Sequence, residues 1–143
     1  GDLNVSKFGS RLAGCGGFID ITQNAKKLVY CGTFTTKGLR TECRDGKLVI
    51  LQEGSRKKFV RQVEHITFSG RYAVETGQPV LYVTERAVFA LRPEGMTLIE
   101  IAPGIDLQTQ ILDQMDFVPQ IAEDLKLMDA RIFREEKMGL ADV

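Results

Sequence analysis

The pattern of apolar and polar positions predicts a chain of short strands with few helices. An apolar, β-branched run at 27–34 is typical of a buried strand, and a short helix is expected before it at 18–26. Segments 39–43 and 47–52 flank Asp45-Gly46, a dipeptide that favours a two-residue β-hairpin turn. The first half of the chain therefore predicts a helix, a buried strand and a hairpin.

The middle of the chain predicts an antiparallel meander. Segments 80–84, 87–91 and 97–101 each read as a strand, and a turn at 92–95 separates the last two. Before the meander, alternation in VRQVEHITF (60–68) predicts one more strand. We also expect the end of a strand at 3–6 and a single helical turn at 71–77, closed by Gly77.

A helix is predicted after the meander. Asp106 is its expected N-cap, and Leu107, Ile111 and Met115 recur every four residues to form one apolar face. From Phe117 onward the pattern predicts mostly irregular chain, with one further turn of helix near the end. The fold class predicted from these elements is a strand-rich α/β domain.

Composition excludes several classes of protein. Lysine plus arginine equals aspartate plus glutamate, at 19 each, so a nucleic-acid or other polyanionic partner is not expected. The sequence contains no apolar run near the roughly 20 residues of a membrane span and no signal-peptide pattern, which favours a cytoplasmic location. Cys15, Cys31 and Cys43 are odd in number and lack CxxC spacing, which predicts reduced thiols and no zinc site.

Three glycines among four residues, Gly14, Gly16 and Gly17, call for an explanation. One interpretation is a tight connection between two elements. A second is a main chain that presents N–H groups to an anion or oxyanion at a helix start. A nucleotide-binding loop is excluded because GCGG has neither a Gly-Lys-Ser/Thr ending nor GxGxxG spacing.

Other candidate catalytic residues favour structural roles. His65 is the only histidine, and a strand at 60–68 would place it on one face with Val63 and Thr67. It could act only with a cysteine or serine beside it in space, so a structural or surface role is favoured. Glu75 and Glu85 invite a catalytic interpretation if buried, but salt bridging or turn capping is favoured for both.

Several phrases together resemble the C-terminal part of the family I CoA-transferases. They are NVSKFG at 4–9, GCGGFIDITQNAKK with the strand LVYCGTFT at 14–35, and TERAVFALRPEGMTLIEIAPGIDLQTQILDQMDF at 84–117. The resemblance covers about residues 1–138 and keeps their order. It points to acetate and short-chain acyl-CoA:acetoacetate enzymes, with succinyl-CoA:3-ketoacid transferases as more distant relatives.

The resemblance implies a fold and a mechanism. The fold would be an open α/β sheet like that of the sugar-phosphate isomerases, in a molecule with two related halves. A glutamate carboxylate would attack an acyl-CoA, pass through acyl anhydrides and a glutamyl-CoA thioester, and deliver CoA to a second carboxylic acid. Coenzyme A is then a substrate, and neither a metal nor a redox cofactor is implied.

The family's nucleophile lies in a Glu-x-Gly-x-x-Gly motif that this chain lacks. Glu75-Thr-Gly77-Gln-Pro-Val80 misses the final glycine and falls downstream of the nucleophile's place. We therefore expect residues 1–143 to be a partial C-terminal domain that is inactive alone and works with the rest of a CoA-transferase polypeptide, in an oligomer. The alternative is a non-catalytic remnant or regulatory partner that retains the fold.

The resemblance also assigns residues. The position matching Gly16 supplies a backbone N–H to the oxyanion hole, and Gly14 and Gly17 shape the turn around it. Lys37 is a candidate contact for the anionic end of CoA, although a solvated lysine is the simpler interpretation. Short-chain carboxylic acids such as acetate and acetoacetate are the expected second substrates.

Overall fold

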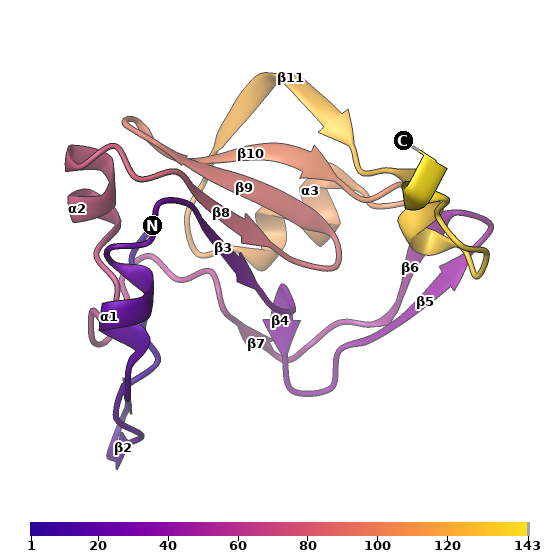
Figure 1. Ribbon diagram of the computed structural model, residues 1–143. Coiled ribbons are helices and arrows are strands. Elements are labelled where there is room, and N and C mark those ends of the chain that lie inside the picture. The colour runs from indigo at the N-terminus through magenta and orange to yellow at the C-terminus, as the bar shows by residue number, and fades with distance from the viewer. Residues whose placement is uncertain (143) are drawn as a thin grey trace.

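The centre of the molecule is a five-stranded mixed sheet, seen in the computed structural model, which describes residues 1–142 (Figure 1). Across the sheet the order of its strands is β11 (Gln120–Leu127), β10 (Gly95–Ile101), β9 (Ala87–Arg92), β8 (Val80–Val83) and β3 (Leu28–Cys31). The β8–β9–β10 meander is antiparallel, as the sequence predicts, and the outer pairs β3–β8 and β10–β11 are parallel. The expected open α/β sheet is confirmed.

The long crossover between β3 and β8 contains two small antiparallel pairs. β5 (Arg40–Arg44) and β6 (Lys47–Gln52) form the hairpin predicted at Asp45-Gly46. Both turn residues have positive φ, 52° and 74°, which a type I′ turn requires. β4 (Thr35–Thr36) pairs with β7 (Arg56–Lys57), and this pair flanks the hairpin in the sequence.

Several expectations about strands are wrong. The buried strand predicted at 27–34 is the short edge strand β3, whose residues are half-buried or exposed. Segment 60–68 is irregular apart from one bridge between Phe68 and Leu3. The chain after Phe117, expected to be irregular, contains the eight-residue strand β11. The predicted late helical turn is present as the 3-10 helix η2 (Ala130–Phe133), and η3 (Leu140–Asp142) follows it.

The helical turn predicted at 71–77 is present and is followed by Gly77 at positive φ, whereas the helices predicted at 18–26 and after Asp106 are shorter than expected. α2 (Gly70–Glu75) is capped by Ser69, whose hydroxyl accepts a hydrogen bond from Tyr72 N–H. Asp106 caps α3 (Leu107–Gln110) as expected, accepting from Thr109 N–H. At Ile111 the backbone leaves helical geometry, with φ −122° and ψ −69°, and the chain continues as the 3-10 helix η1 (Leu112–Gln114).

Aromatic side chains fill the core on the sheet. Phe34, Phe59 and Phe89 form one cluster with ring centroids 4.7 to 6.3 Å apart. Tyr30 packs against Tyr82 and Phe68 in a second cluster, at 5.6 and 5.3 Å. None of the described helices is long and apolar enough to cross a membrane.

An N-terminal arm, residues 6–22, projects from this core (Figure 1). It consists of the hairpin β1 (Lys7–Phe8) and β2 (Arg11–Leu12), the glycine turn at 14–17, and the helix α1 (Phe18–Thr22). The predicted strand at 3–6 is reduced to the bridge of Leu3 with Phe68, and the hairpin pairing begins at Lys7. α1 covers only the first part of the predicted helix at 18–26. The arm places the glycine turn at the periphery of the fold.

Candidate functional site

The glycine turn, residues 14–17, joins the arm's hairpin to α1. Gly14 and Gly16 both have positive φ, 75° and 51°, a region that residues with a Cβ rarely adopt. Phe18 N–H donates to Cys15 O at 3.0 Å and closes the turn where the helix begins. Both features expected from the glycines, a tight connection and a helix start, are therefore present.

The N–H group of Gly16 has no acceptor within hydrogen-bond distance among residues 1–142. A Cβ built at Gly16 would meet no atom within 4 Å, so the space beside the residue is open. Such a free, fixed N–H in an accessible turn is able to donate to an oxygen of a bound molecule, because no internal hydrogen bond has to be broken first.

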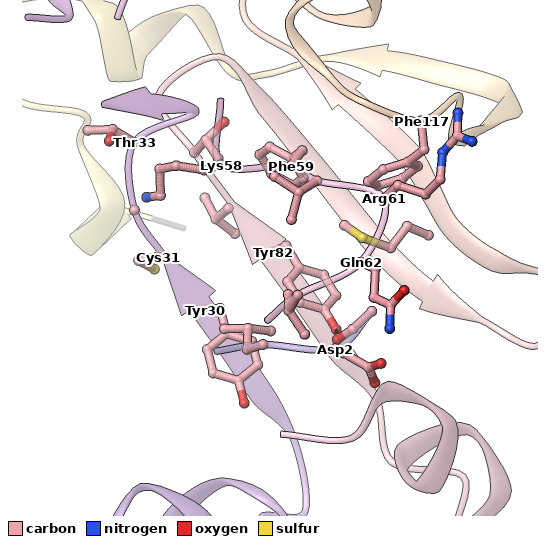
Figure 2. A pocket seen from close by; sticks show the side chains of 18 residues that line it. Asp2, Tyr30, Cys31, Thr33, Lys58, Phe59, Arg61, Gln62, Tyr82 and Phe117 are labelled. Carbon is pink, nitrogen blue, oxygen red and sulfur yellow. Dashed lines mark hydrogen bonds between the residues drawn. The ribbon is translucent and has the colours of Figure 1, made fainter. Parts of the chain in front are cut away.

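A groove of about 470 Å³ lies between the sheet and the segment 58–63 (Figure 2). Tyr30 and Tyr82, from the neighbouring strands β3 and β8, form its floor, and Tyr82 Oη donates to Gly1 O at 2.5 Å. Burial raises the pKa of Tyr30 to about 12 and also raises that of Tyr82. Both phenols are therefore neutral near pH 7 and are not catalytic bases. The Tyr30 hydroxyl oxygen is buried, and the Tyr82 hydroxyl already donates to Gly1 O.

The charged residues of the groove do not converge on one point. Lys58 and Arg61 stand on the same irregular segment but extend toward different ends of the groove (Figure 2). Cys31, a free thiol, lies near the Lys58 end. No described group of three or more histidine, cysteine or acidic side chains in residues 1–142 could hold a metal ion.

A buried ionic cluster surrounds Arg86. Its guanidinium is completely buried and lies 2.6 Å from carboxylate oxygens of both Glu53 and Glu85. Burial alone would lower the pKa of Arg86, but the hydrogen bonds to the two carboxylates outweigh it and raise that pKa. Glu85 also accepts from Phe34 N–H at 2.8 Å. The salt-bridge interpretation of Glu85 is confirmed, whereas sequence reasoning missed Arg86 and Glu53.

The other candidates lie apart from the glycine turn or have structural partners. Glu75 pairs with Arg71 across one exposed turn of α2 at 2.8 Å, as the salt-bridge interpretation predicts. Lys37 is exposed in the loop after β4, well away from α1 (Figure 1). His65 Nδ1 lies 2.6 Å from Ser6 Oγ, but Ser6 is buried, so this serine–histidine pair is structural rather than nucleophilic.

No protein-family model matches the chain. Curated proteins do: the acetate CoA-transferase YdiF of Escherichia coli K12 is 55% identical over 139 residues, which are 97% of this chain and 26% of that protein. The caffeate CoA-transferase of Acetobacterium woodii is 57% identical over 145 residues, covering 98% of this chain and 28% of that protein. The chain thus spans about a quarter of the length of these relatives.

Solved structures agree with this similarity. The acyl-CoA transferase YdiF from Escherichia coli O157:H7, in a thioester complex with CoA, superposes with a TM-score of 0.95 at 55% identity, over 98% of this chain and 27% of that one. The decarboxylase AibA/AibB shares the fold alone, with a TM-score of 0.61 at 19% identity over 89% of this chain and 45% of that one. The chain is therefore homologous to one part of the family I CoA-transferases.

Proposed function

We propose that this chain works as part of an acyl-CoA:carboxylate CoA-transferase that exchanges CoA between short-chain acids such as acetate and acetoacetate. The observation that carries the proposal is the 55% identity to an acetate CoA-transferase over 97% of the chain. The partners are CoA thioesters, short-chain carboxylic acids and the remainder of the longer polypeptide, in a homo-oligomer. CoA enters as a substrate, and no further cofactor takes part.

The proposed chemistry proceeds through addition and elimination at carbonyl carbons. A glutamate carboxylate outside residues 1–143 attacks the acyl-CoA carbonyl, and the CoA thiolate leaves to give an acyl anhydride. The thiolate then attacks the glutamyl carbonyl, which releases the first acid and forms the glutamyl-CoA thioester. The second acid reverses these steps. Each addition places a negative charge on a carbonyl oxygen, which must be stabilised.

We assign one donor to that oxyanion, the N–H of Gly16. Its free amide, positive φ and open surroundings support the assignment, because a residue without a Cβ allows a thioester to approach the main chain. Gly14 and Gly17 hold the shape of the turn. Lys37, whose exposed side chain stands in the loop after β4, contacts the anionic end of CoA.

The test uses the longer polypeptide that contains this chain and measures CoA exchange between acetyl-CoA and acetoacetate. The purified 143-residue chain alone should show no exchange, because the nucleophile lies outside it. Exchange by the chain alone, at a rate near that of the longer enzyme, would refute this division of roles. A folded longer polypeptide without exchange would instead favour the non-catalytic alternative.

Gly16→Ala in the longer enzyme tests the donor. We expect kcat to fall about 100-fold to 1000-fold, as for removal of one oxyanion donor. Gly77→Ala is the matched control, because Gly77 also has positive φ, 69°, and open space where a Cβ would stand. Both variants should lose stability by about 1 kcal/mol or more from backbone strain. If Gly16→Ala loses no more activity per folded molecule than Gly77→Ala, then Gly16 only shapes the turn and is not an oxyanion donor.

A further inference from the structure

The irregular segment 64–69 contacts the chain on both sides of the glycine turn. On the N-terminal side its contact is Ser6, whose hydroxyl oxygen lies 2.6 Å from His65 Nδ1 and 2.8 Å from Thr67 Oγ1. A hydroxyl donates one hydrogen bond and accepts others, so Ser6 can satisfy both neighbours at once. Ser6 and Thr67 are only 4% and 5% exposed, which shields the hydrogen bond between their two hydroxyls from water, whereas His65 is exposed.

The main chain of Ser6 contacts the turn directly. Its carbonyl oxygen accepts hydrogen bonds from Ala13 N–H at 2.8 Å and from Gly14 N–H at 3.1 Å. Gly14 is the first residue of the turn, two positions before the free amide of Gly16. The side chain of Ser6 is therefore held by segment 64–69 while its main chain holds the start of the turn.

The same segment also contacts the chain before the arm and the tip of the arm's hairpin. Leu3 exchanges backbone hydrogen bonds with Phe68 in both directions, at 3.1 Å each. At the hairpin tip, Gly9 N–H donates to the two carboxylate oxygens of Glu64 at 2.7 and 3.0 Å. These contacts hold the chain before the hairpin and the hairpin's tip, in addition to the Ser6 contact at its base.

On the C-terminal side of the turn the contact is Gln23, which follows α1. Its side-chain oxygen accepts from Ser69 N–H at 3.0 Å, and its side-chain nitrogen donates back to Ser69 O at 3.4 Å. Gln78 adds a second restraint, donating to Thr22 O and Ala25 O at 2.7 Å each. The glycine turn is thus held between two anchored ends, and segment 64–69 supplies an anchor to each.

We infer that segment 64–69 sets the position of the Gly16 amide, and that His65 is a positioning residue for CoA transfer. The inference rests on the proposed function of Gly16. His65 acts through Ser6 and touches neither the turn nor a substrate. Without the ring nitrogen of His65, the Ser6 hydroxyl keeps only Thr67, so one of the two hydrogen bonds that orient this side chain is lost.

The experiment compares three variants in the longer enzyme. His65→Ala removes the ring nitrogen, His65→Asn returns a side-chain polar atom near the place of Nδ1, and Arg71→Ala is an exposed control on α2. We expect His65→Ala to lower kcat about tenfold with KM nearly unchanged, since a small misplacement of a donor costs transition-state stabilisation. His65→Asn should restore most of this loss, and the control should behave as the parent.

Hydrogen exchange of the peptide covering 13–18 provides a readout independent of activity. Its amides should exchange faster in His65→Ala than in the parent, and not in Arg71→Ala. Unchanged exchange and kcat in His65→Ala would overturn the inference even if Gly16→Ala is inactive. A normal kcat in Gly16→Ala would refute the donor role instead, and faster exchange at 13–18 would then support the anchoring alone. Thr67→Val, which removes the other partner of Ser6, should accelerate the same amides, and failure to do so counts against the network.

Discussion

The guanidinium of Arg86 and the carboxylate of Glu53 meet at 2.6 Å, although 33 residues separate them in the sequence. Arg86 stands between β8 and β9, and Glu53 follows β6, so the pair ties the long crossover to the central sheet. The Arg86 side chain is fully buried, and its charge depends on Glu53 and Glu85 for compensation. Removing either carboxylate leaves a buried cation with fewer partners.

Glu53→Gln should therefore destabilise the protein strongly. Breaking one partner of a buried ion pair costs about 3 to 5 kcal/mol, and the loss here should lie near the lower end because Glu85 remains. Urea unfolding measures it. Glu42→Gln, which breaks an exposed pair with Arg44, is the control and should cost less than about 1 kcal/mol. Equal losses in the two variants would show that burial of Arg86 carries no special cost.

The same carboxylate predicts a dependence of stability on pH. Burial would raise the pKa of Glu53, but hydrogen bonds from Arg86 and Thr35 outweigh it and hold the folded-state pKa below the ordinary value of 4.5. A lowered folded-state pKa contributes stability above pH 4.5, and this is lost as pH falls through the folded value. The stability difference between the parent and Glu53→Gln should therefore shrink below pH 4.5. Urea unfolding of both proteins, repeated from about pH 7 to about pH 3, measures this difference. A difference that stays constant over this range would contradict the prediction.

The outer edge of β3 predicts self-association of the 143-residue chain. β3 pairs with β8 on one side only and ends the sheet, and its Val29 is 55% exposed. An apolar edge strand offers unpaired backbone groups to another chain. Sedimentation at low micromolar concentration should show dimers or larger species, and Val29→Lys should reduce them. Ile132→Lys, equally exposed at 53% but far from this edge, is the control. A monomeric parent chain would disprove the prediction.

Gly54 should tolerate no side chain. A Cβ there would stand 2.5 Å from Thr36 O and 2.8 Å from Thr36 N, and backbone atoms cannot move aside as a side chain can. Gly54→Ala should lower the free energy of unfolding by about 1 to 3 kcal/mol, the range for overpacking. Gly32→Ala is the control, because its closest neighbour is the flexible end of Lys58 at 3.1 Å. Thermal melts of both variants decide whether the clash matters.

Elements set by neighbouring residues were predictable from the sequence. The Asp45-Gly46 hairpin depends on two residues that accept positive φ, and the cap at Asp106 depends on a carboxylate three residues before the N–H that it binds. The meander β8–β9–β10 needs only short connections between alternating strands. The glycine turn was likewise visible in the sequence, because glycine is needed where φ is positive.

The contacts between distant parts of the chain were decided by the tertiary structure. Segment 60–68 has a strand-like pattern, but at its end Thr67 and Phe68 bond to Leu3 instead of to a strand of the sheet. β11 was missed because α3 and η1 separate it in the sequence from its parallel partner β10, and because Ala122 is its only buried residue. The sequence by itself determined the turns, caps and short hairpins, since these need only local contacts. Only the fold could determine which segments meet at Arg86 and Ser6, because those contacts join residues 33 to 61 positions apart.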